Sequence, residues 1–251
     1  MCFLDGDGFR AISAACMTEY SAKNLLDPEQ HRDSCGFGLI ANLDDLPSHW
    51  VVETAIEALA RLTHRGAVAA DGKTGDGCGL LLKFPEAFLR VVGEELGFKL
   101  SKRFAAGTIF LSRDPATATA ARKAINAAIA ATGLEVAGWR DVPVDPSACG
   151  EQALATLPEI QQVYVNAPGG MPRGAFNRKL FLARRRAEKR ISDDETYIAS
   201  LSSVTISYKG MIMPDALPVF YPDLRDPRLE SSVCVFHQRF STNTLPQWRL
   251  A

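Results

Sequence analysis

Three short stretches of the chain carry residue types that could do chemistry, and the first contains Cys35. In Cys35-Gly-Phe-Gly the two glycines leave the backbone around the sulfur open to the close approach of a substrate. If the chain were cleaved after Ser34, Cys35 would carry a thiol and also a free α-amine, whose pKa is about 7.7 to 8.0. That amine could accept the thiol proton near neutral pH, so one residue would supply nucleophile and base. The alternative is an internal cysteine that acts as a small buried apolar residue.

The second and third stretches could bind a polar ligand. His64-Arg65-Gly66 precedes the glycine-rich segment Thr74-Gly-Asp-Gly77, and Arg239-Phe-Ser-Thr-Asn-Thr244 follows an apolar run near the end of the chain. An arginine in the last segment could hold a carboxylate through two parallel hydrogen bonds, with hydroxyl and amide groups beside it. Each stretch taken alone is also compatible with a structural role, namely a turn, a satisfied histidine or a capped strand end.

The elements that must position these stretches follow from hydrophobic periodicity. A helical period with Ser48 as N-cap predicts a helix over 47–62, and Gly133 is expected to end a second, alanine-rich helix. Residues 63–79 are predicted to be a polar loop. The predicted strands are 35–42, 80–84, 106–112, 134–142, 160–166, 204–213 and 232–241, and the predicted helices are 47–62, 114–132 and 177–190. Strands and helices without a regular βαβ alternation indicate an α+β layered domain.

Composition narrows the class of protein. The 251 residues are 47% hydrophobic and 23% charged, as in an ordinary globular protein. The net charge of −1 gives no electrostatic reason to expect nucleic acid or a membrane surface as a partner. The basic helix 177–190 is therefore interpreted as a solvated face. No apolar run approaches the roughly 20 residues of a membrane span, and residues 1–34 do not have the pattern of a secretory signal. Six cysteines without metal-ligand spacing predict no metal site and a reducing, cytoplasmic compartment.

Considered together, the motifs resemble a specific family. Asp33-Ser-Cys-Gly-Phe-Gly, Leu62-Thr-His-Arg-Gly-Ala, Lys73-Thr-Gly-Asp-Gly-Cys-Gly and His237-Gln-Arg-Phe-Ser-Thr-Asn-Thr-Leu-Pro-Gln-Trp248 are similar to the class II glutamine amidotransferase domain of the glutamate synthase large subunit. The order and spacing of these motifs fit from about residue 25 to the end of the chain. Cys78 stands where a smaller residue is expected.

The resemblance implies a fold and a site. The fold would be the four-layer αββα sandwich of the N-terminal-nucleophile hydrolases, over 35–251, with 1–34 as a leader or propeptide. Cys35 would be the catalytic nucleophile that hydrolyses glutamine to glutamate and ammonia. The implied substrate-binding residues are Arg65, Gly66, Arg239, Phe240, Thr242 and Asn243, with Arg239 on the α-carboxylate of glutamine.

The resemblance also implies partners outside these residues. Ammonia would pass to 2-oxoglutarate in downstream synthase domains of the same subunit, and these domains would hold FMN and a 3Fe-4S cluster. The whole reaction would serve glutamate biosynthesis and ammonia assimilation. Electrons would come from NADPH, NADH or ferredoxin, in some members through a small electron-donating subunit. In the family an Asn-Gly pair forms the oxyanion hole, and the resemblance places that pair beyond Trp248. We therefore expect a sandwich that is truncated at its C-terminus, inactive by itself, and with 232–241 as an exposed edge strand.

Two other functions fit the same residues less well. The chain could be an N-terminal cysteine hydrolase that acts on other amides, in which case Arg239 would be dispensable. It could also be a non-catalytic binding module in which Cys35 is buried.

Overall fold

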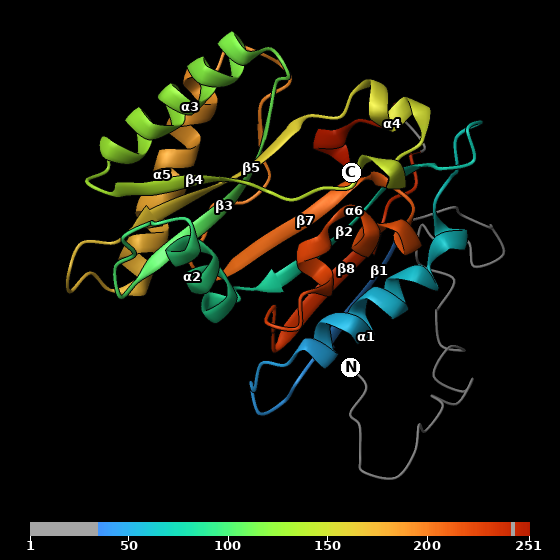
Figure 1. Ribbon diagram of the computed structural model, residues 1–251, viewed down its shortest axis with the longest axis horizontal. Helices are drawn as coiled ribbons and strands as arrows, with labels where there is room; N and C mark the ends of the chain where they lie inside the picture. Colours follow the sequence, from blue (N-terminus) through green and yellow to red (C-terminus); the bar gives the residue numbers. More distant parts are fainter. Residues whose placement is uncertain (1–34, 242–243) are drawn as a thin grey trace, which may run out of the picture. The chain divides into compact units, whose positions relative to one another are not determined.

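A computed structural model describes residues 35–241 and 244–251, which belong to one structural unit (Figure 1). The predicted leader 1–34 and the predicted site residues Thr242 and Asn243 lie outside the described residues. The strands are β1 Gly36–Ala41, β2 Thr74–Lys83, β3 Phe104–Leu111, β4 Glu135–Asp141, β5 Glu159–Asn166, β6 Tyr197–Ile198, β7 Thr205–Ile212 and β8 Val233–Gln238. The α-helices are α1 His49–Ala60, α2 Glu86–Glu95, α3 Pro115–Ala130, α4 Glu151–Ala155, α5 Arg173–Arg190 and α6 Leu217–Phe220. The short 3₁₀ helices are η2 Thr63–Arg65, η3 Pro146–Ala148, η4 Pro214–Ala216, η5 Pro222–Arg225 and η6 Trp248–Leu250.

The first sheet has the strand order β1-β8-β2-β7, and all of its neighbours are antiparallel. The predicted exposed edge at 232–241 is wrong, because β8 pairs with β1 on one side and with β2 on the other. Alternate residues of β8 are buried at Cys234, Phe236 and Gln238, as expected for an inner strand with one face on a core. The strand ends at Gln238, so Arg239 and the residues after it lie beyond the sheet.

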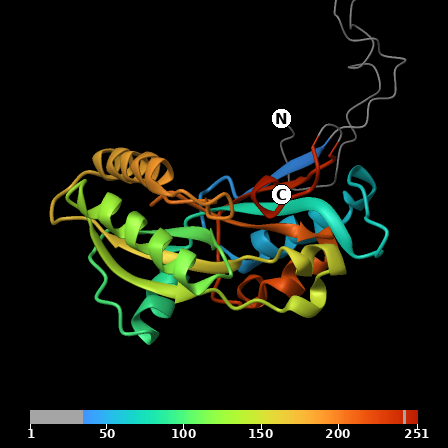
Figure 2. The ribbon, with the colours of Figure 1, turned by 90° about the horizontal axis from the view of Figure 1, so that it is seen from above.

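The second sheet has the order β4-β5-β3-β6 and is also antiparallel. Its strands and the two long helices between them follow the order β3-α3-β4-β5-α5-β6 along the chain, with the short η3 and α4 inserted between β4 and β5, which is the split βαβ arrangement. Helices α3 and α5 lie beside each other against one face of this sheet (Figure 2). Their buried side chains and those of the sheet, such as Ile125, Leu180 and Val163, form one apolar cluster. The sequence did not predict helix α2, which packs Phe88 and Leu89 into the other core.

The two sheets share a second core, which also includes α1. Phe104, Phe110 and Tyr164 of the second sheet belong to the same buried cluster as Leu80 and Tyr208 of the first sheet. Deep in this core, Arg140 of β4 forms a two-bond ion pair with Asp223 of η5, with both contacts at 2.7 Å. Two antiparallel sheets with helices against them confirm the predicted α+β sandwich. No helix among the described residues is long and apolar enough to cross a membrane.

The predicted loop 63–79 is wrong in its second half, because β2 already begins at Thr74. Glycines are poor strand formers in general, which is why the Thr-Gly-Asp-Gly segment resembled a loop. Here they are required by close packing: a Cβ on Gly75 would lie 2.8 Å from the carbonyl oxygen of Ile212, and Gly77 has a φ of +129°. The segment therefore enters the sheet beside the end of β8.

The basic helix has a structural role in part. Lys179 and Arg186 of α5 donate hydrogen bonds to the carbonyl oxygens of Thr132 and Ala131, which follow the last turn of α3. Cations at this position pair with carbonyl groups that lack a partner within the helix. Arg184 and Arg185 both pair with Glu188. The basic helix 177–190, which the sequence indicates as a solvated face, therefore also contacts the end of α3.

Candidate active site

Cys35 differs from the other described cysteines in its exposure. Cys78, Cys149 and Cys234 are buried, and burial raises the pKa of the Cys149 thiol to about 11 and that of Cys234 to about 12. Burial also raises the pKa of Cys78, whose S–H donates to the carbonyl oxygen of Ile212. These thiols stay protonated and enclosed, whereas Cys35 is exposed. Of the described cysteines, Cys35 is therefore the one that a substrate can reach.

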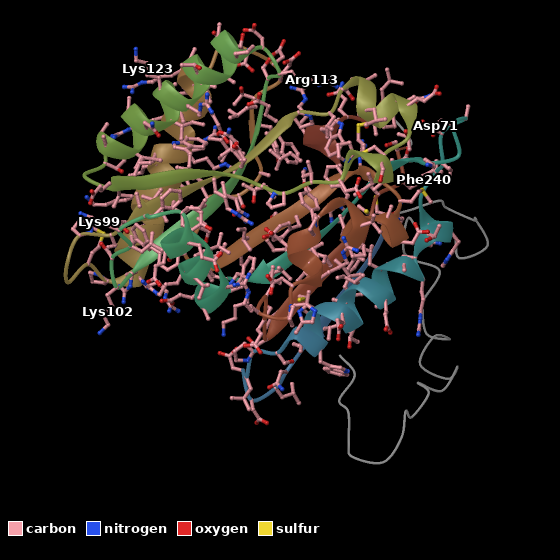
Figure 3. All side chains as sticks on the ribbon, viewed as in Figure 1. Asp71, Lys99, Lys102, Arg113, Lys123 and Phe240 are labelled. Atoms are coloured by element: carbon pink, nitrogen blue, oxygen red, sulfur yellow. The ribbon has the colours of Figure 1, made fainter. Side chains whose placement is uncertain are left out.

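Strand pairing brings Cys35 to the Arg239 segment. Gly36 is paired with Gln238, so the residue before β1 lies beside the residues that follow β8. The main-chain N–H of Phe240 lies 3.3 Å from Sγ of Cys35, and the carbonyl oxygen of Phe240 is 3.9 Å from the same sulfur. Figure 3 shows the half-buried Phe240 on the side of the view where Asp71 also lies, opposite Lys99 and Lys102. The sulfur of Cys35 and the main chain of Phe240 are therefore in direct contact.

Arg239 is held by β2. Its main-chain N–H donates to the carbonyl oxygen of Gly77 at 2.8 Å, and Nη1 donates to the carbonyl oxygen of Asp76 at 3.2 Å. Nη2 donates to the hydroxyl of Thr244. These contacts orient the half-buried guanidinium, and they use two of its five N–H donors. The planar, forked arrangement of the guanidinium N–H donors is suited to a carboxylate.

The surroundings of Arg239 are electropositive. Burial, together with the charges of Arg239 and Arg184, lowers the pKa of Lys209 to about 8. Burial and the neighbouring charge of Lys209 also lower the pKa of His237. The positive charges of Lys209 and Arg239 thus lie close enough to act on each other, and positive charge favours the binding of an anion.

Arg65 and Gly66 complete this end of the sheet. A Cβ on Gly36 would lie 3.1 Å from Cβ of Arg65, so the stem of Arg65 packs beside the residue that follows Cys35. A Cβ on Gly66 would lie 1.8 Å from Nε2 of the buried Gln238 and 3.0 Å from the carbonyl oxygen of Arg239. Gly66 is thus fixed by a close approach of two backbones. His64 contacts the carbonyl oxygen of Arg61 through Nδ1, which is a local structural contact.

Asp76 is a residue that the sequence drew attention to but did not assign to the site. Its carboxylate accepts a hydrogen bond from the main-chain N–H of Ser241 at 2.6 Å, and its side chain is almost fully buried. The signal was the Gly-Asp-Gly pattern, because an acidic side chain between two glycines marks an unusual backbone position. The structure thus brings Cys35, Arg65, Gly66, Arg239 and Phe240 together, with Asp76 beneath them.

The described residues do not fit a metal or an iron–sulfur cluster. No three His, Cys, Asp or Glu side chains in 35–241 and 244–251 come together in an arrangement that could hold a metal ion. Cys78, Cys149 and Cys234 belong to the same apolar core, where burial raises the pKa of each thiol.

Comparisons with known proteins agree with this geometry. The sequence model of the family described as "Glutamine amidotransferases class-II" matches residues 35–251. The chain is 43% identical over 97% of its length to "Glutamate synthase [NADPH] large chain" of Azospirillum brasilense. It is 39% identical over 91% of its length to "Ferredoxin-dependent glutamate synthase 1, chloroplastic/mitochondrial" of Arabidopsis thaliana, and 38% identical over 92% to the Bacillus subtilis NADPH large chain.

The chain spans 16%, 14% and 15% of the lengths of these three relatives. The family match begins at Cys35, the exposed cysteine beside Phe240, and continues through both sheets to the last residue. With its α+β sandwich of the N-terminal-nucleophile hydrolase type, this chain belongs to the class-II glutamine amidotransferases.

Proposed function

We propose that Cys35 is the nucleophile that hydrolyses the side-chain amide of glutamine in a glutamate synthase large subunit, of which this chain is the amidotransferase part. The observation that carries the proposal is the exposed Cys35 thiol against the main-chain N–H of Phe240, next to the oriented guanidinium of Arg239. A nucleophile beside a carboxylate-binding arginine is the arrangement that an amino-acid amide requires.

Activation of Cys35 requires a free α-amine, so residues 1–34 are proposed to be a propeptide that is removed after Ser34. The amine then accepts the thiol proton near neutral pH. The N–H of Phe240 stabilises the resulting thiolate. This arrangement needs no histidine, and His64 is engaged with the carbonyl oxygen of Arg61.

Substrate recognition is proposed to depend on the α-carboxylate of glutamine. Arg239, oriented by its contacts with Asp76 and Thr244, binds it through paired N–H donors. Thr242 and Asn243 are proposed as further polar contacts on the segment that continues from Phe240. Arg65 and Gly66 shape the wall of the site beside Cys35. A hydrolase that acts on other amides would not need the Arg239 contact. A non-catalytic module would have Cys35 buried, whereas Cys35 is exposed.

The reaction then proceeds in two steps. The thiolate of Cys35 attacks the carbonyl carbon of the glutamine side chain, the C–N bond breaks, and the amine proton of Cys35 leaves with the nitrogen as ammonia. Water then attacks the glutamyl thioester and gives one proton to the α-amine, the C–S bond breaks to release the thiolate of Cys35, and glutamate leaves after its new carboxyl group loses the second proton of the water to solvent. Binding by Arg239 keeps the substrate in place through both steps, which lowers the entropic cost of each attack.

The activity of the whole subunit is also proposed from the relatives. Ammonia released at Cys35 would react with 2-oxoglutarate in further synthase domains, where FMN and a 3Fe-4S cluster supply the electron-transfer chemistry. The relatives include NADPH-dependent and ferredoxin-dependent synthases, so the electron donor is proposed to be NADPH, NADH or ferredoxin, with a small electron-donating subunit as an expected partner. The unpaired state of the described cysteines supports a reducing, cytoplasmic location.

The deciding experiment is Cys35→Ser in the full-length subunit. A serine hydroxyl is far less acidic than a thiol, so glutamine-dependent glutamate formation should be lost while ammonia-dependent formation continues. Cys234→Ser, at a buried cysteine outside the site, serves as the control and should retain both activities. Glutamine-dependent activity that persists in Cys35→Ser would overturn the proposal, and loss of both activities would assign Cys35 to folding.

A further inference from the structure

We propose that Asp76 is a positioning residue of this site, whose carboxylate fixes the segment 239–241 so that the N–H of Phe240 faces Cys35. The inference rests on the proposed function, because it concerns how the nucleophile of that reaction is held. Asp76 does not touch Cys35 in the described contacts, so its effect is transmitted through the backbone of the segment.

Asp76 contacts the segment on both sides of Phe240. Its carboxylate accepts from the N–H of Ser241 at 2.6 Å, and its carbonyl oxygen accepts from Nη1 of Arg239 at 3.2 Å. The next residue, Gly77, accepts from the N–H of Arg239 at 2.8 Å. The N–H groups of Arg239 and Ser241, one residue before and one after Phe240, are therefore both tied to the beginning of β2, and the Phe240 N–H between them is directed at the sulfur of Cys35.

A side-chain acceptor is needed because 239–241 lies beyond the sheet. The strand β8 ends at Gln238, so the N–H of Ser241 has no strand partner in the ladder. A half-buried N–H without an acceptor costs free energy, and the carboxylate of Asp76 supplies the acceptor from within the protein. A charged acceptor makes a shorter and stronger bond than a neutral one, in agreement with the 2.6 Å separation.

Asp76 is itself held in place by its neighbours. Its side chain is only 6% exposed, and its main-chain N–H donates to the carbonyl oxygen of Ala67. The following Gly77 has a φ of +129°, and a Cβ there would lie 2.4 Å from Cα of Ala251. The carboxylate thus projects from a backbone that packing on both sides constrains, which is what a positioning group requires.

The test compares Asp76→Ala with Asp76→Asn in the full-length subunit. Asparagine keeps an oxygen that can accept from Ser241, whereas alanine keeps none. We expect Asp76→Ala to lower glutamine-dependent kcat/KM by about tenfold to a hundredfold, mainly through kcat, with ammonia-dependent activity unchanged. Asp76→Asn should stay within a few-fold of the native value. If alanine has no effect, or if asparagine is as poor as alanine, the positioning role is overturned.

Asp114→Ala is the matched control. Asp114 also accepts from a main-chain N–H, that of Thr117 at 2.7 Å, but it caps α3 on the second sheet. Its loss should leave glutamine-dependent activity unchanged, and an equal decrease would show that general destabilisation explains the effect. If Asp76→Ala does not fold, Asp76→Glu replaces it, because a longer side chain cannot keep the same contact. Asparagine should then exceed glutamate in activity, and the reverse order overturns the role.

Cys35→Ser in the same assay separates the two proposals. If Cys35→Ser abolishes glutamine-dependent activity while Asp76→Ala does not, this inference is wrong and the proposed function stands. If Cys35→Ser retains that activity, the proposed function is wrong, whatever Asp76→Ala does.

Discussion

The main-chain N–H of Phe240 lies 3.3 Å from Sγ of Cys35, although the two residues are 205 positions apart in the chain. The pairing of Gly36 with Gln238 explains the contact, because it places the residue before β1 against the residues after β8. The sheet therefore positions a nucleophile on one strand end and a polar, arginine-containing segment on its neighbour.

The active subunit should begin at Cys35. The α-amine that we propose as the base exists only if residues 1–34 are removed. Intact mass and N-terminal sequencing of the purified full-length subunit should show their loss, and Cys35→Ala, which removes the nucleophile, should slow or block this step if processing is autocatalytic. Active enzyme that retains residues 1–34 would contradict the mechanism.

Arg239→Lys should raise the KM for glutamine. A lysine cannot reproduce the planar two-bond contact with a carboxylate, and loss of that contact should cost about 1.5 to 3 kcal/mol, or about tenfold to a hundredfold in KM. Steady-state kinetics with glutamine and with ammonia would separate substrate binding from the rest of the reaction. Arg185→Lys, on the exposed face of α5, is the control and should leave KM unchanged. An unchanged KM in Arg239→Lys would remove this residue from the site.

Gly66→Ala should impair the site through packing. The new Cβ would lie 1.8 Å from Nε2 of Gln238 and 3.0 Å from the carbonyl oxygen of Arg239, so one of these residues must move. We expect a loss of about 1 to 3 kcal/mol of stability and a fall in glutamine-dependent activity. Gly169→Ala, where a Cβ would meet nothing within 4 Å, should change neither. Equal behaviour of the two variants in urea unfolding and activity assays would refute the close approach.

Arg140→Met should destabilise the whole unit without acting on the site directly. It leaves Asp223, only 5% exposed in its side chain, as a buried charge without its ion-pair partner. The expected cost is about 3 to 5 kcal/mol in urea unfolding. The double variant Arg140→Met/Asp223→Leu removes both charges and should regain much of that loss. A double variant as unstable as the single one would show that the packing of Arg140, and not the charge of Asp223, is what matters.

Lys209→Met should stabilise the protein at neutral pH. The pKa of Lys209 in the folded state is about 8, below the usual 10.5, because burial and the charge of Arg239 disfavour the protonated form. Below pH 8 the amine of Lys209 is protonated in both the folded and the unfolded states. The folded state then carries the full cost of holding the charged amine in this environment, on the order of 1 to 3 kcal/mol. Between pH 8 and 10.5 the unfolded state binds more protons, so native stability rises with pH.

Thermal unfolding at pH 7 and pH 10 measures this effect. The Tm of Lys209→Met should exceed that of the native protein at pH 7, and the difference should narrow at pH 10. The substitution also removes the hydrogen bond from Nζ to the carbonyl oxygen of Arg249, which offsets part of the gain at every pH. A difference in Tm that does not change with pH would contradict the lowered pKa.

Local signals in the sequence were sufficient for most helices and strands. Ser48 caps α1 and Asp114 caps α3 through their own side chains, and the hydrophobic period continues from each cap. Such features depend on residues within a few positions of one another, so the sequence alone determines them. The predicted α+β class and the motif resemblance that identified the family were available for the same reason.

The tertiary structure decided which strands pair and what their ends bring together. No local pattern shows that β8 lies between β1 and β2, because that order depends on pairing between strands far apart in the chain. Nor does a local pattern show that Gly75 and Gly77 belong to a strand, because they are required by the close approach of Ile212 and Ala251. The contact of Asp76 with Ser241 spans 165 positions and arises only once β2 and β8 are paired. Sequence determined the candidate residues through their types and spacing, whereas the contacts that orient them come from long-range strand pairing, which only the folded chain supplies.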